Sequence, residues 1–238
     1  MNLAPALRRP LVRARRAVYE ALGSGRYSRM ALNNLDRKLE RHLDFDGGVF
    51  VEAGANDGIE QSNTYYLEKF RGWIGLLIEP EPTLAAACQR NRRARVAQAA
   101  LVATEQPGAT VELHFAGLMS TLDGALGGAE ATVRHVQIGL KVQPEIAGTR
   151  RVRVPARTLS ALLDEAGMVR PVDLLSLDVE GAEPEALRGI DYSRHAPRFI
   201  CVEVRDDAAI AAVLEPRYRV VEVLSDLSTH RDLLYSLR

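Results

Sequence analysis

The chain has 238 residues, of which 47% are hydrophobic, so it is long enough to bury a complete core as one main domain. Its 31 basic residues balance its 31 acidic residues, and a net charge of zero argues against a general nucleic-acid binder. Two cysteines do not make a disulfide framework, and no stretch approaches about 20 apolar residues, so we expect a soluble, cytoplasmic protein.

The first 30 residues form a basic and amphipathic segment. Glu20 is its single acid, and Pro10 interrupts a pattern of interleaved arginines and aliphatic residues. Such a pattern is typical of a solvated helix that packs on its own domain, but also of a membrane-surface contact or a lid over a binding site. We expect residues 1–46 to form a basic helical extension, and the sequence leaves its role open.

From about residue 47, short apolar strands alternate with helices, which predicts a mostly parallel sheet that is covered on both faces. The expected strands are 49–53, 74–79, 95–102, 172–178 and 198–204. The expected helices are 60–70, 82–92, 158–167, 182–189 and 206–213. The last two strands, 218–224 and 231–237, flank a loop too short for a crossover helix, so they form an antiparallel hairpin. The prediction is a seven-stranded, doubly wound, Rossmann-like α/β sheet closed by this hairpin, which is the layout of the class I methyltransferase fold.

The predicted main domain, residues 47–238, contains an insert at about residues 103–157. Apart from a strand at Val111–Phe115, the insert looks irregular and is rich in glycine. Loops of this length inside a compact domain are usually functional or mobile. We expect the insert to cover a ligand and to shape the pocket beside it.

The segment 50–58, with the sequence FVEAGANDG, is the most informative part of the chain. Here an apolar strand reaches Glu52 and turns into a loop whose two glycines can take positive φ and approach a ligand closely. Glu52 and Asp57 would repel a phosphate, and Asn56 and Ile59 break the G-x-G-x-x-G pattern of a dinucleotide site. The loop therefore favours a cationic nucleoside without phosphates, and S-adenosylmethionine is one.

A second acid supports a nucleoside site. Glu79 follows the apolar run Trp73–Ile78, about twenty residues after the loop, where a carboxylate can accept both hydroxyls of a ribose. Dinucleotide enzymes have an acid at the same distance, so Glu79 alone indicates a nucleoside and no particular cofactor. The alternative is that Glu79 caps a surface turn.

A third motif, Val172–Glu183, delivers Asp178 and Glu180 to the carboxyl end of a buried strand. Ligands of open α/β sheets bind at that edge. If this strand lies next to strand 49–53, both acids face the crevice of the first loop. Glu183 would lie in the first turn of the next helix, where an acid stabilises the helix dipole, so we assign it a structural role.

Five segments follow one another between about residues 48 and 204: FVEAGANDG, SNTYYLE, GLLIEP, DLLSLDVEGAE and ICVE. Together they resemble the FkbM family of S-adenosylmethionine-dependent methyltransferases. The resemblance does not cover residues 1–40. It implies a class I methyltransferase fold and an O-methyltransferase that acts on a sugar or related hydroxyl of a glycolipid, a surface polysaccharide or a secondary metabolite.

The resemblance also implies a cofactor site, position by position. The methionyl part would be held by the first loop, through Glu52, Gly54, Asn56, Asp57 and Gly58. Ser62 and Asn63 would close that side, and Glu79 would take the ribose. Within the insert only Ser120 resembles the family, as a contact to the adenine or carboxylate side; a role as a turn residue is the alternative.

Methyl transfer to a hydroxyl requires that oxygen, methyl carbon and sulfur are aligned and that a proton is removed. We expect Asp178, with Glu180 beside it, to orient or deprotonate the acceptor. A carboxylate of low pKa is a weak base for an alcohol, so His135 of the insert is a further candidate base, with a solvated loop histidine as the alternative. Asp178, Glu180 and Glu203 also form a candidate Mg²⁺ site, although nothing in their spacing demands a metal.

Two other functions stay open: a nucleotide-linked oxidoreductase on a similar sheet, and a non-catalytic binding protein that keeps the cofactor fold. The broken glycine pattern and the terminal hairpin disfavour the first, and the pair Asp178 and Glu180 disfavours the second. We expect a small-molecule or glycolipid acceptor and no nucleic-acid partner. A peripheral membrane contact through residues 1–30 is an additional hypothesis.

Overall fold

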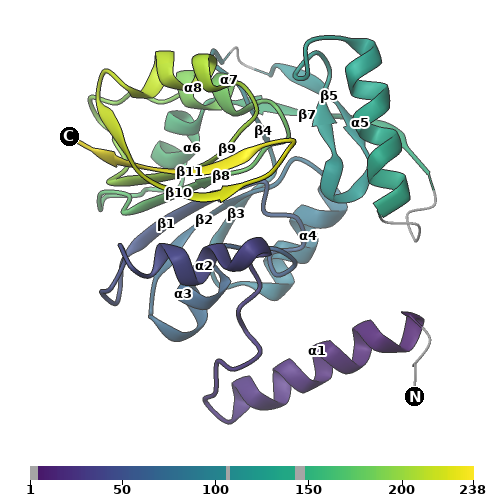
Figure 1. Ribbon diagram of the computed structural model, residues 1–238, viewed down its shortest axis with the longest axis vertical. Coiled ribbons are helices and arrows are strands. Elements are labelled where there is room, and N and C mark those ends of the chain that lie inside the picture. The colour runs from purple at the N-terminus through teal and green to yellow at the C-terminus, as the bar shows by residue number, and fades with distance from the viewer. Residues whose placement is uncertain (1–4, 106–107, 143–147) are drawn as a thin grey trace.

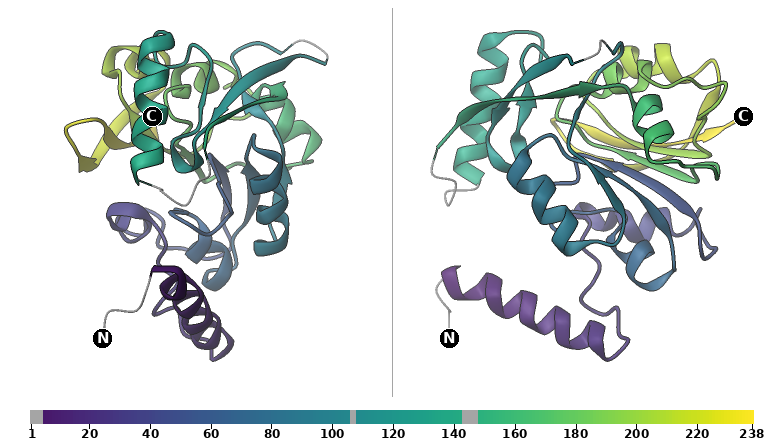
Figure 2. Two further views of the ribbon diagram at one scale, coloured as in Figure 1. Left: turned by 90° about the vertical axis from the view of Figure 1, so that its right-hand side faces the viewer. Right: turned by 180° about the vertical axis from the view of Figure 1, so that it is seen from behind.

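The structure is a computed structural model that describes residues 5–105, 108–142 and 148–238. It contains a large sheet with helices on both faces and a smaller sheet beside it (Figure 1; Figure 2). The α-helices are α1 (Pro5–Ala21), α2 (Leu35–Leu39), α3 (Tyr65–Phe70), α4 (Pro82–Asn91), α5 (Ala129–Val142), α6 (Leu159–Glu165), α7 (Glu183–Arg188) and α8 (Asp207–Leu214), and the 3-10 helices are η1 (Leu32–Asn34) and η2 (Gly117–Met119).

The strands fall into two sheets. The large sheet contains β1 (Val49–Ala53), β2 (Ile74–Ile78), β3 (Arg95–Ala97), β8 (Leu174–Leu177), β9 (Phe199–Val204), β10 (Tyr218–Asp226) and β11 (Arg231–Leu237). The small sheet contains β4 (Ala100–Leu101), β5 (Thr110–Phe115), β6 (Thr121–Leu122) and β7 (Arg150–Arg157).

The large sheet has the order β10-β11-β9-β8-β1-β2-β3. Strands β9, β8, β1, β2 and β3 are parallel, and β11 is antiparallel to both of its neighbours. The chain builds outward from β1 to β3 and then returns to place β8 on the other side of β1, so the strand order reverses between β1 and β8. The predicted seven-stranded, doubly wound α/β sheet with a C-terminal hairpin is thereby confirmed.

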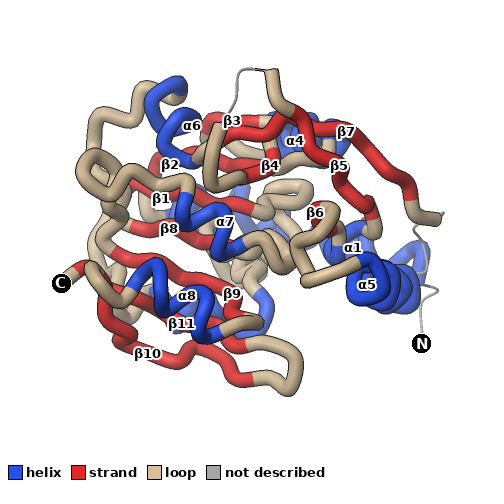
Figure 3. The backbone as a smooth tube through the Cα atoms, turned by 90° about the horizontal axis from the view of Figure 1, so that it is seen from above, coloured by secondary structure: helices blue, strands red, loops and turns tan. Residues whose placement is uncertain are grey.

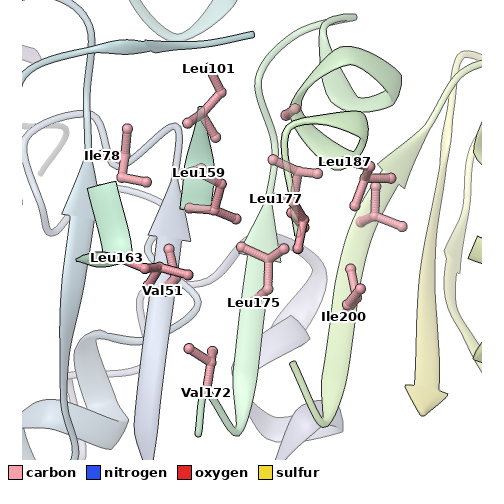
Figure 4. Packing of buried hydrophobic residues seen from close by; sticks show 14 of the residues in the cluster. Val51, Ile78, Leu101, Leu159, Leu163, Val172, Leu175, Leu177, Leu187 and Ile200 are labelled. Atoms are coloured by element: carbon pink, nitrogen blue, oxygen red, sulfur yellow. The ribbon is translucent and has the colours of Figure 1, made fainter. Parts of the chain in front are cut away.

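Alternate residues of each strand pack on opposite faces of the sheet, as the pleat requires. Val49 and Val51 of β1 join the core beneath α6, α7 and α8, whereas Phe50 joins the core beneath α2, α3 and α4. Figure 4 shows the first of these cores, where Leu159 and Leu187 of the covering helices pack among strand residues. This rigid three-layer body fixes the positions of the strand ends.

The N-terminal segment divides into two parts. Leu35, Leu39 and Leu43 are buried in the core, so the packed domain begins before the predicted boundary at residue 47. Helix α1 instead lies to one side of the body (Figure 1), and several of its apolar side chains are exposed. None of the described helices combines the length and the apolar character needed to cross a membrane.

The region 95–157 differs from its prediction in two ways. The expected strand 95–102 is two strands, because β3 pairs in the large sheet whereas β4 pairs with β7 in the small sheet. The insert is also not irregular: β5, β6 and β7 form the small sheet, and α5 packs beside it (Figure 3). Residues of β7 alternate in burial, with Val154 fully buried, and this period of two was the overlooked signal.

Candidate active site

A cleft opens at the carboxyl ends of β1, β2 and β8, where the strand order reverses. Its empty space is about 950 Å³ with the open mouth included. The insert closes one side of it through η2 and β6. Most of the residues predicted from the sequence line this cleft: Glu52, Gly54, Asn56, Ser62, Asn63, Glu79, Ser120, Asp178 and Glu180.

Glu52 is the organising residue of the first loop. Its Oε1 accepts a hydrogen bond from the Asn63 backbone N–H at 2.7 Å, and its Oε2 accepts from Ser62 Oγ at 2.8 Å and Thr64 Oγ1 at 2.6 Å. The buried Arg92 guanidinium lies 3.4 Å from the same Oε2 and balances its charge. Because these donors occupy the carboxylate, Glu52 shapes the cleft mainly through the residues it holds in place.

Gly54 allows the ends of β1 and β8 to meet. Its φ is +81°, and a Cβ at this position would lie 1.7 Å from the backbone carbonyl oxygen of Asp178. Any other residue would therefore push the two strand ends apart. The glycine brings the first loop against Asp178 in addition to lining the cleft.

Glu79 is 5% exposed, so it is not a cap on a surface turn. Its Oε2 accepts from the Asn56 backbone N–H at 2.9 Å, and its Oε1 accepts from the Glu81 backbone N–H at 3.0 Å. Burial raises the pKa of Glu79 to about 7, although both hydrogen bonds oppose this rise. Each carboxylate oxygen keeps a further lone pair, so the group can still accept hydrogen bonds from a diol.

An apolar wall near Glu79 was not identified from the sequence. It contains Ile78, Leu84 and Leu101 together with Leu113 of β5. These residues offer a site for a flat apolar group such as a nucleobase. Leu113 comes from the insert, and only the alternation of apolar Val111, Leu113 and Phe115 with polar residues along β5 could have pointed to it.

Asp178 follows β8 directly, and its side chain is exposed to the cleft. Protein nevertheless surrounds the carboxyl group on most sides, and this desolvation raises its pKa well above the ordinary value of 3.8. The negative charges of Glu203, Glu180 and Glu183 act in the same direction. Asp178 is thus a stronger base than an ordinary carboxylate, which answers the objection that a carboxylate is too weak.

Glu180 connects the cleft to the insert. Its Oε2 lies 2.6 Å from Arg205 Nη2 and 3.0 Å from His135 Nε2, and its carbonyl oxygen accepts from Thr121 Oγ1 at 2.7 Å. His135 is therefore a buried residue of α5 and not a solvated loop histidine. It is not among the described residues that line the cleft, and its role as a base stays a prediction.

The predicted metal set also changes. Asp178, Glu183 and Glu203 each bring a carboxylate oxygen within 4.8 Å of the others, whereas Glu180 is not part of this group. Arg205 lies 2.6 Å from both Glu180 and Glu203 and supplies a fixed positive charge beside the cluster. Glu183 lies in the first turn of α7, as predicted. The Arg205 guanidinium therefore balances part of the negative charge of these carboxylates.

Three predicted cofactor contacts have structural roles. Asp57 is not among the described residues that line the cleft, and its Oδ1 closes a turn by accepting from two following backbone N–H groups. Gly58 faces α4, where a Cβ would lie 2.9 Å from Arg92 Cγ. Ser120 does line the cleft, but its Oγ donates to the Gly117 carbonyl at 2.6 Å, so the turn role is present as well.

The chain is similar to several known proteins. Methyltransferase 1 of Beauveria bassiana (strain ARSEF 2860) is 29% identical over 151 residues, which cover 61% of this chain and 59% of that protein. Among solved structures, a methyltransferase FkbM from Methylobacillus flagellatus KT has a TM-score of 0.47 at 14% identity and covers 80% of this chain and 44% of the other. A TehB-like S-adenosylmethionine-dependent methyltransferase from Corynebacterium glutamicum ATCC 13032 Kitasato has a TM-score of 0.44 at 12% identity and covers 99% and 100%.

The family assignment rests on a broader match. The profile described as the methyltransferase FkbM domain matches residues 52–232, which include every strand of the large sheet except the first residues of β1 and the last of β11. This match supports an assignment to the S-adenosylmethionine-dependent methyltransferases. This chain therefore belongs to the FkbM methyltransferase domain family, as its sequence motifs predicted.

Proposed function

We propose that this protein transfers a methyl group from S-adenosylmethionine to a hydroxyl oxygen of a sugar or glycoside. One observation supports this choice of cofactor. The cleft is lined by carboxyl groups, which belong to Glu52, Glu60, Glu79, Asp178 and Glu180. No lysine or arginine occurs among the described lining residues. This environment suits a sulfonium and an ammonium group and repels a pyrophosphate.

The residues of the cleft also fit the parts of this cofactor. Glu79 would accept the ribose hydroxyls, the wall with Leu101 and Leu113 would cover the adenine, and the loop held by Glu52 would enclose the methionyl part. When bound, S-adenosylmethionine supplies the methyl group, and its sulfur keeps the electron pair of the broken C–S bond. The carboxylates offset the positive charge of the donor.

The chemistry left to the chain is alignment and removal of one proton. Asp178 would orient the acceptor hydroxyl and take its proton as the new C–O bond forms. Positioning can contribute about 7 to 11 kcal/mol in favourable cases, and a general base contributes about 10²- to 10⁴-fold. Glu180, fixed by Arg205 and His135, would hold the Asp178 loop and is a positioning residue.

Calorimetry distinguishes this function from a nucleotide-linked oxidoreductase. The protein should bind S-adenosylmethionine and S-adenosylhomocysteine, and it should not bind NAD or NADP. Tight binding of NADP together with no binding of S-adenosylmethionine would reverse the assignment. A protein that binds the donor but never transfers its methyl group would be the non-catalytic alternative.

The acceptor class needs a separate experiment. The protein is incubated with methyl-labelled S-adenosylmethionine and a panel of glycolipids and deoxysugar glycosides, and mass spectrometry locates the label. We expect a mass gain of one methyl group on a sugar oxygen. Label on nitrogen or on a non-carbohydrate oxygen, with the glycosides unmodified, would reject the sugar proposal while keeping methyl transfer.

The acidic cluster of Asp178, Glu183 and Glu203 raises the question of whether the reaction requires Mg²⁺. Magnesium prefers oxygen ligands, which this cluster offers, but Arg205 already places a cation beside it. We expect turnover to survive EDTA and to be unchanged by added Mg²⁺. Loss of activity in EDTA and its recovery with Mg²⁺ would assign the cluster to a metal.

We also infer a peripheral membrane contact for α1. Leu11, Val12 and Val18 are exposed by 53%, 44% and 57%, and the exposed Arg13 and Arg15 lie among them. Apolar and basic side chains on one exposed helix suit an anionic lipid surface. Such a contact would bring the cleft close to an acceptor presented on a lipid.

A further inference from the structure

A second, smaller cavity lies behind Asp178, with an empty space of about 410 Å³ when its opening to solvent is included. Four residues line both this cavity and the cleft described above: Gln61, Asn63, Ser176 and Asp178. These residues form a polar junction between the two spaces. A group in the small cavity can therefore meet a group in the cleft only at Asp178 and its neighbours.

The small cavity is built by chain segments that are distant in the sequence. Leu32 of η1 and Leu35 of α2 form one wall, and an isolated parallel bridge between Ala31 and Gln61 holds that segment in place. His230 and Asp232 come from the hairpin of β10 and β11 and form another wall. The cavity thus exists only where the N-terminal segment and the terminal hairpin converge on the sheet edge.

The two walls differ in chemistry. Leu32 and Leu35 are apolar, whereas Glu203, His230 and Asp232 are polar. His230 is held in place, since its Nε2 lies 3.5 Å from Glu203 Oε2 and its Nδ1 lies 3.0 Å from Thr229 Oγ1. A pyranose ring has the same division, with an apolar face of C–H groups and a rim of hydroxyls that donate hydrogen bonds.

The junction also contains an unsatisfied acceptor. Asn63 Nδ2 donates to Ser176 Oγ at 2.9 Å, but Asn63 Oδ1 is buried and has no hydrogen-bond partner among the described residues. A buried acceptor without a partner is costly, and a ligand hydroxyl at this position would satisfy it. This atom lies on a residue that lines both spaces, where the reacting groups would meet.

We propose that the small cavity is the acceptor subsite, and that it holds one neutral sugar ring with its reacting hydroxyl at the junction beside Asp178. The inference rests on the proposed function, because it assigns the second substrate of the same reaction. The carboxylates of Glu203 and Asp232 would accept hydroxyls of the ring, and His230 would contact its rim. Leu32 and Leu35 would cover its apolar face.

The first test blocks the cavity without touching the cofactor cleft. Leu32→Trp changes a half-exposed side chain of η1, so it fills the cavity with little effect on the core. Leu22→Trp is the matched control, because Leu22 is 77% exposed and does not line either space. With methyl α-L-rhamnopyranoside as the acceptor, kcat/KM should fall about tenfold or more in Leu32→Trp and stay unchanged in the control.

The second test reads binding directly. Nuclear magnetic resonance follows the histidine side chains of the full-length protein, saturated with S-adenosylhomocysteine, as methyl α-L-rhamnopyranoside is added. The His230 signals should shift, those of His195 beside Ser160 should not, and Leu32→Trp should abolish the shift. A shift of His135 in place of His230 would put the acceptor on the side of α5 and overturn the proposal.

These outcomes separate the inference from the function beneath it. A protein that does not bind S-adenosylmethionine fails the proposed function itself. Normal cofactor affinity and normal glycoside turnover in Leu32→Trp would overturn the acceptor subsite alone. Cofactor binding with neither turnover nor a His230 shift for any glycoside of the panel would overturn the sugar-ring assignment of the cavity.

Discussion

Glu52 and Asp178 stand at the ends of two neighbouring parallel strands, yet their carboxylates have opposite surroundings. Glu52 is buried among hydrogen-bond donors and the Arg92 guanidinium. No described residue donates a hydrogen bond to the Asp178 carboxylate, and other carboxylates face it. The contrast shows that the Glu52 carboxylate is occupied by hydrogen bonds that hold the site together, whereas the Asp178 carboxylate is free to bind a ligand. Glu79 is intermediate, since it is buried with two backbone donors and faces the cleft.

The largest effect should come from Glu52→Ala. The change leaves the buried Arg92 with Glu68 as its one remaining ion-pair partner among the described residues and removes the acceptor for Ser62 and Thr64. Breaking a buried pair costs about 3 to 5 kcal/mol of unfolding free energy, which urea denaturation measures. Glu185→Ala, at an exposed ion pair, is the control and should cost less than about 1 kcal/mol. Equal losses in the two variants would contradict the organising role of Glu52.

Asp178→Asn should separate turnover from stability. It keeps the size of the side chain but removes the base, so kcat should fall by about 10²- to 10⁴-fold. Urea denaturation should show no loss of stability, because the substitution relieves repulsion from Glu203 and Glu180. The exposed Asp44 provides the control substitution Asp44→Asn. A stability loss like that of Glu52→Ala, with kcat retained, would reverse the comparison.

Glu79→Ala should weaken binding of S-adenosylmethionine. The loss of a charged hydrogen-bond acceptor costs about 1 to 3 kcal/mol, which corresponds to about a 5- to 150-fold rise in Kd by calorimetry. The fold should persist, because the Asn56 N–H that loses this acceptor borders the cleft and can bind water. Unchanged affinity in the folded variant would refute the ribose assignment.

The stability of the protein should also depend on pH through Glu79. Its pKa is about 7 in the folded protein and 4.5 ordinarily, so the folded state retains this proton more tightly than the unfolded state. The stability contributed by the neutral carboxyl is complete below pH 4.5 and is lost as the pH rises towards about 7. Urea midpoints of wild type and Glu79→Gln should therefore diverge across this window, with the variant less sensitive to pH. Parallel curves would show that Glu79 ionises normally.

The smallest effect concerns the N-terminal segment. Here too, one part is bound to the domain and another part is exposed. Glu20 accepts from Ser28 and Tyr65 and ties the end of α1 to the domain, whereas residues 11–18 are largely exposed. Removal of residues 1–18 should leave folding and cofactor affinity unchanged. Binding to phosphatidylglycerol vesicles should weaken by about 1 kcal/mol per arginine near the surface, and less at high salt.

Vesicles of phosphatidylcholine alone provide the control for this experiment, together with the double variant Arg13→Glu and Arg15→Glu. Both shortened and charge-reversed chains should lose the salt-sensitive binding. If the shortened chain unfolds or no longer binds S-adenosylmethionine, α1 is a structural helix of the domain. If the full chain ignores anionic vesicles, the membrane contact is rejected.

The sequence by itself determined the sheet, the hairpin, the family and the strand ends that carry the acids, because apolar alternation and motif spacing are local properties. It misjudged the region 95–157, where a period of two was hidden among the arginines of β7. It placed Asp178 and Glu180 beside the cleft, although it grouped Glu180 with the metal candidates and left a solvated loop as the alternative for His135, which lies on α5.

Only the tertiary structure decided the partners of each group. Nothing in the sequence pairs Arg92 with Glu52 or Arg205 with Glu180, because those contacts depend on which segments meet at the sheet edge. The raised pKa of Asp178 likewise arises from burial at the convergence of several elements and, to a smaller degree, from the negative charges of acids on separate elements. The small cavity needs residues near 32, 61, 203 and 230 to converge, and their separation along the chain leaves no local pattern to detect.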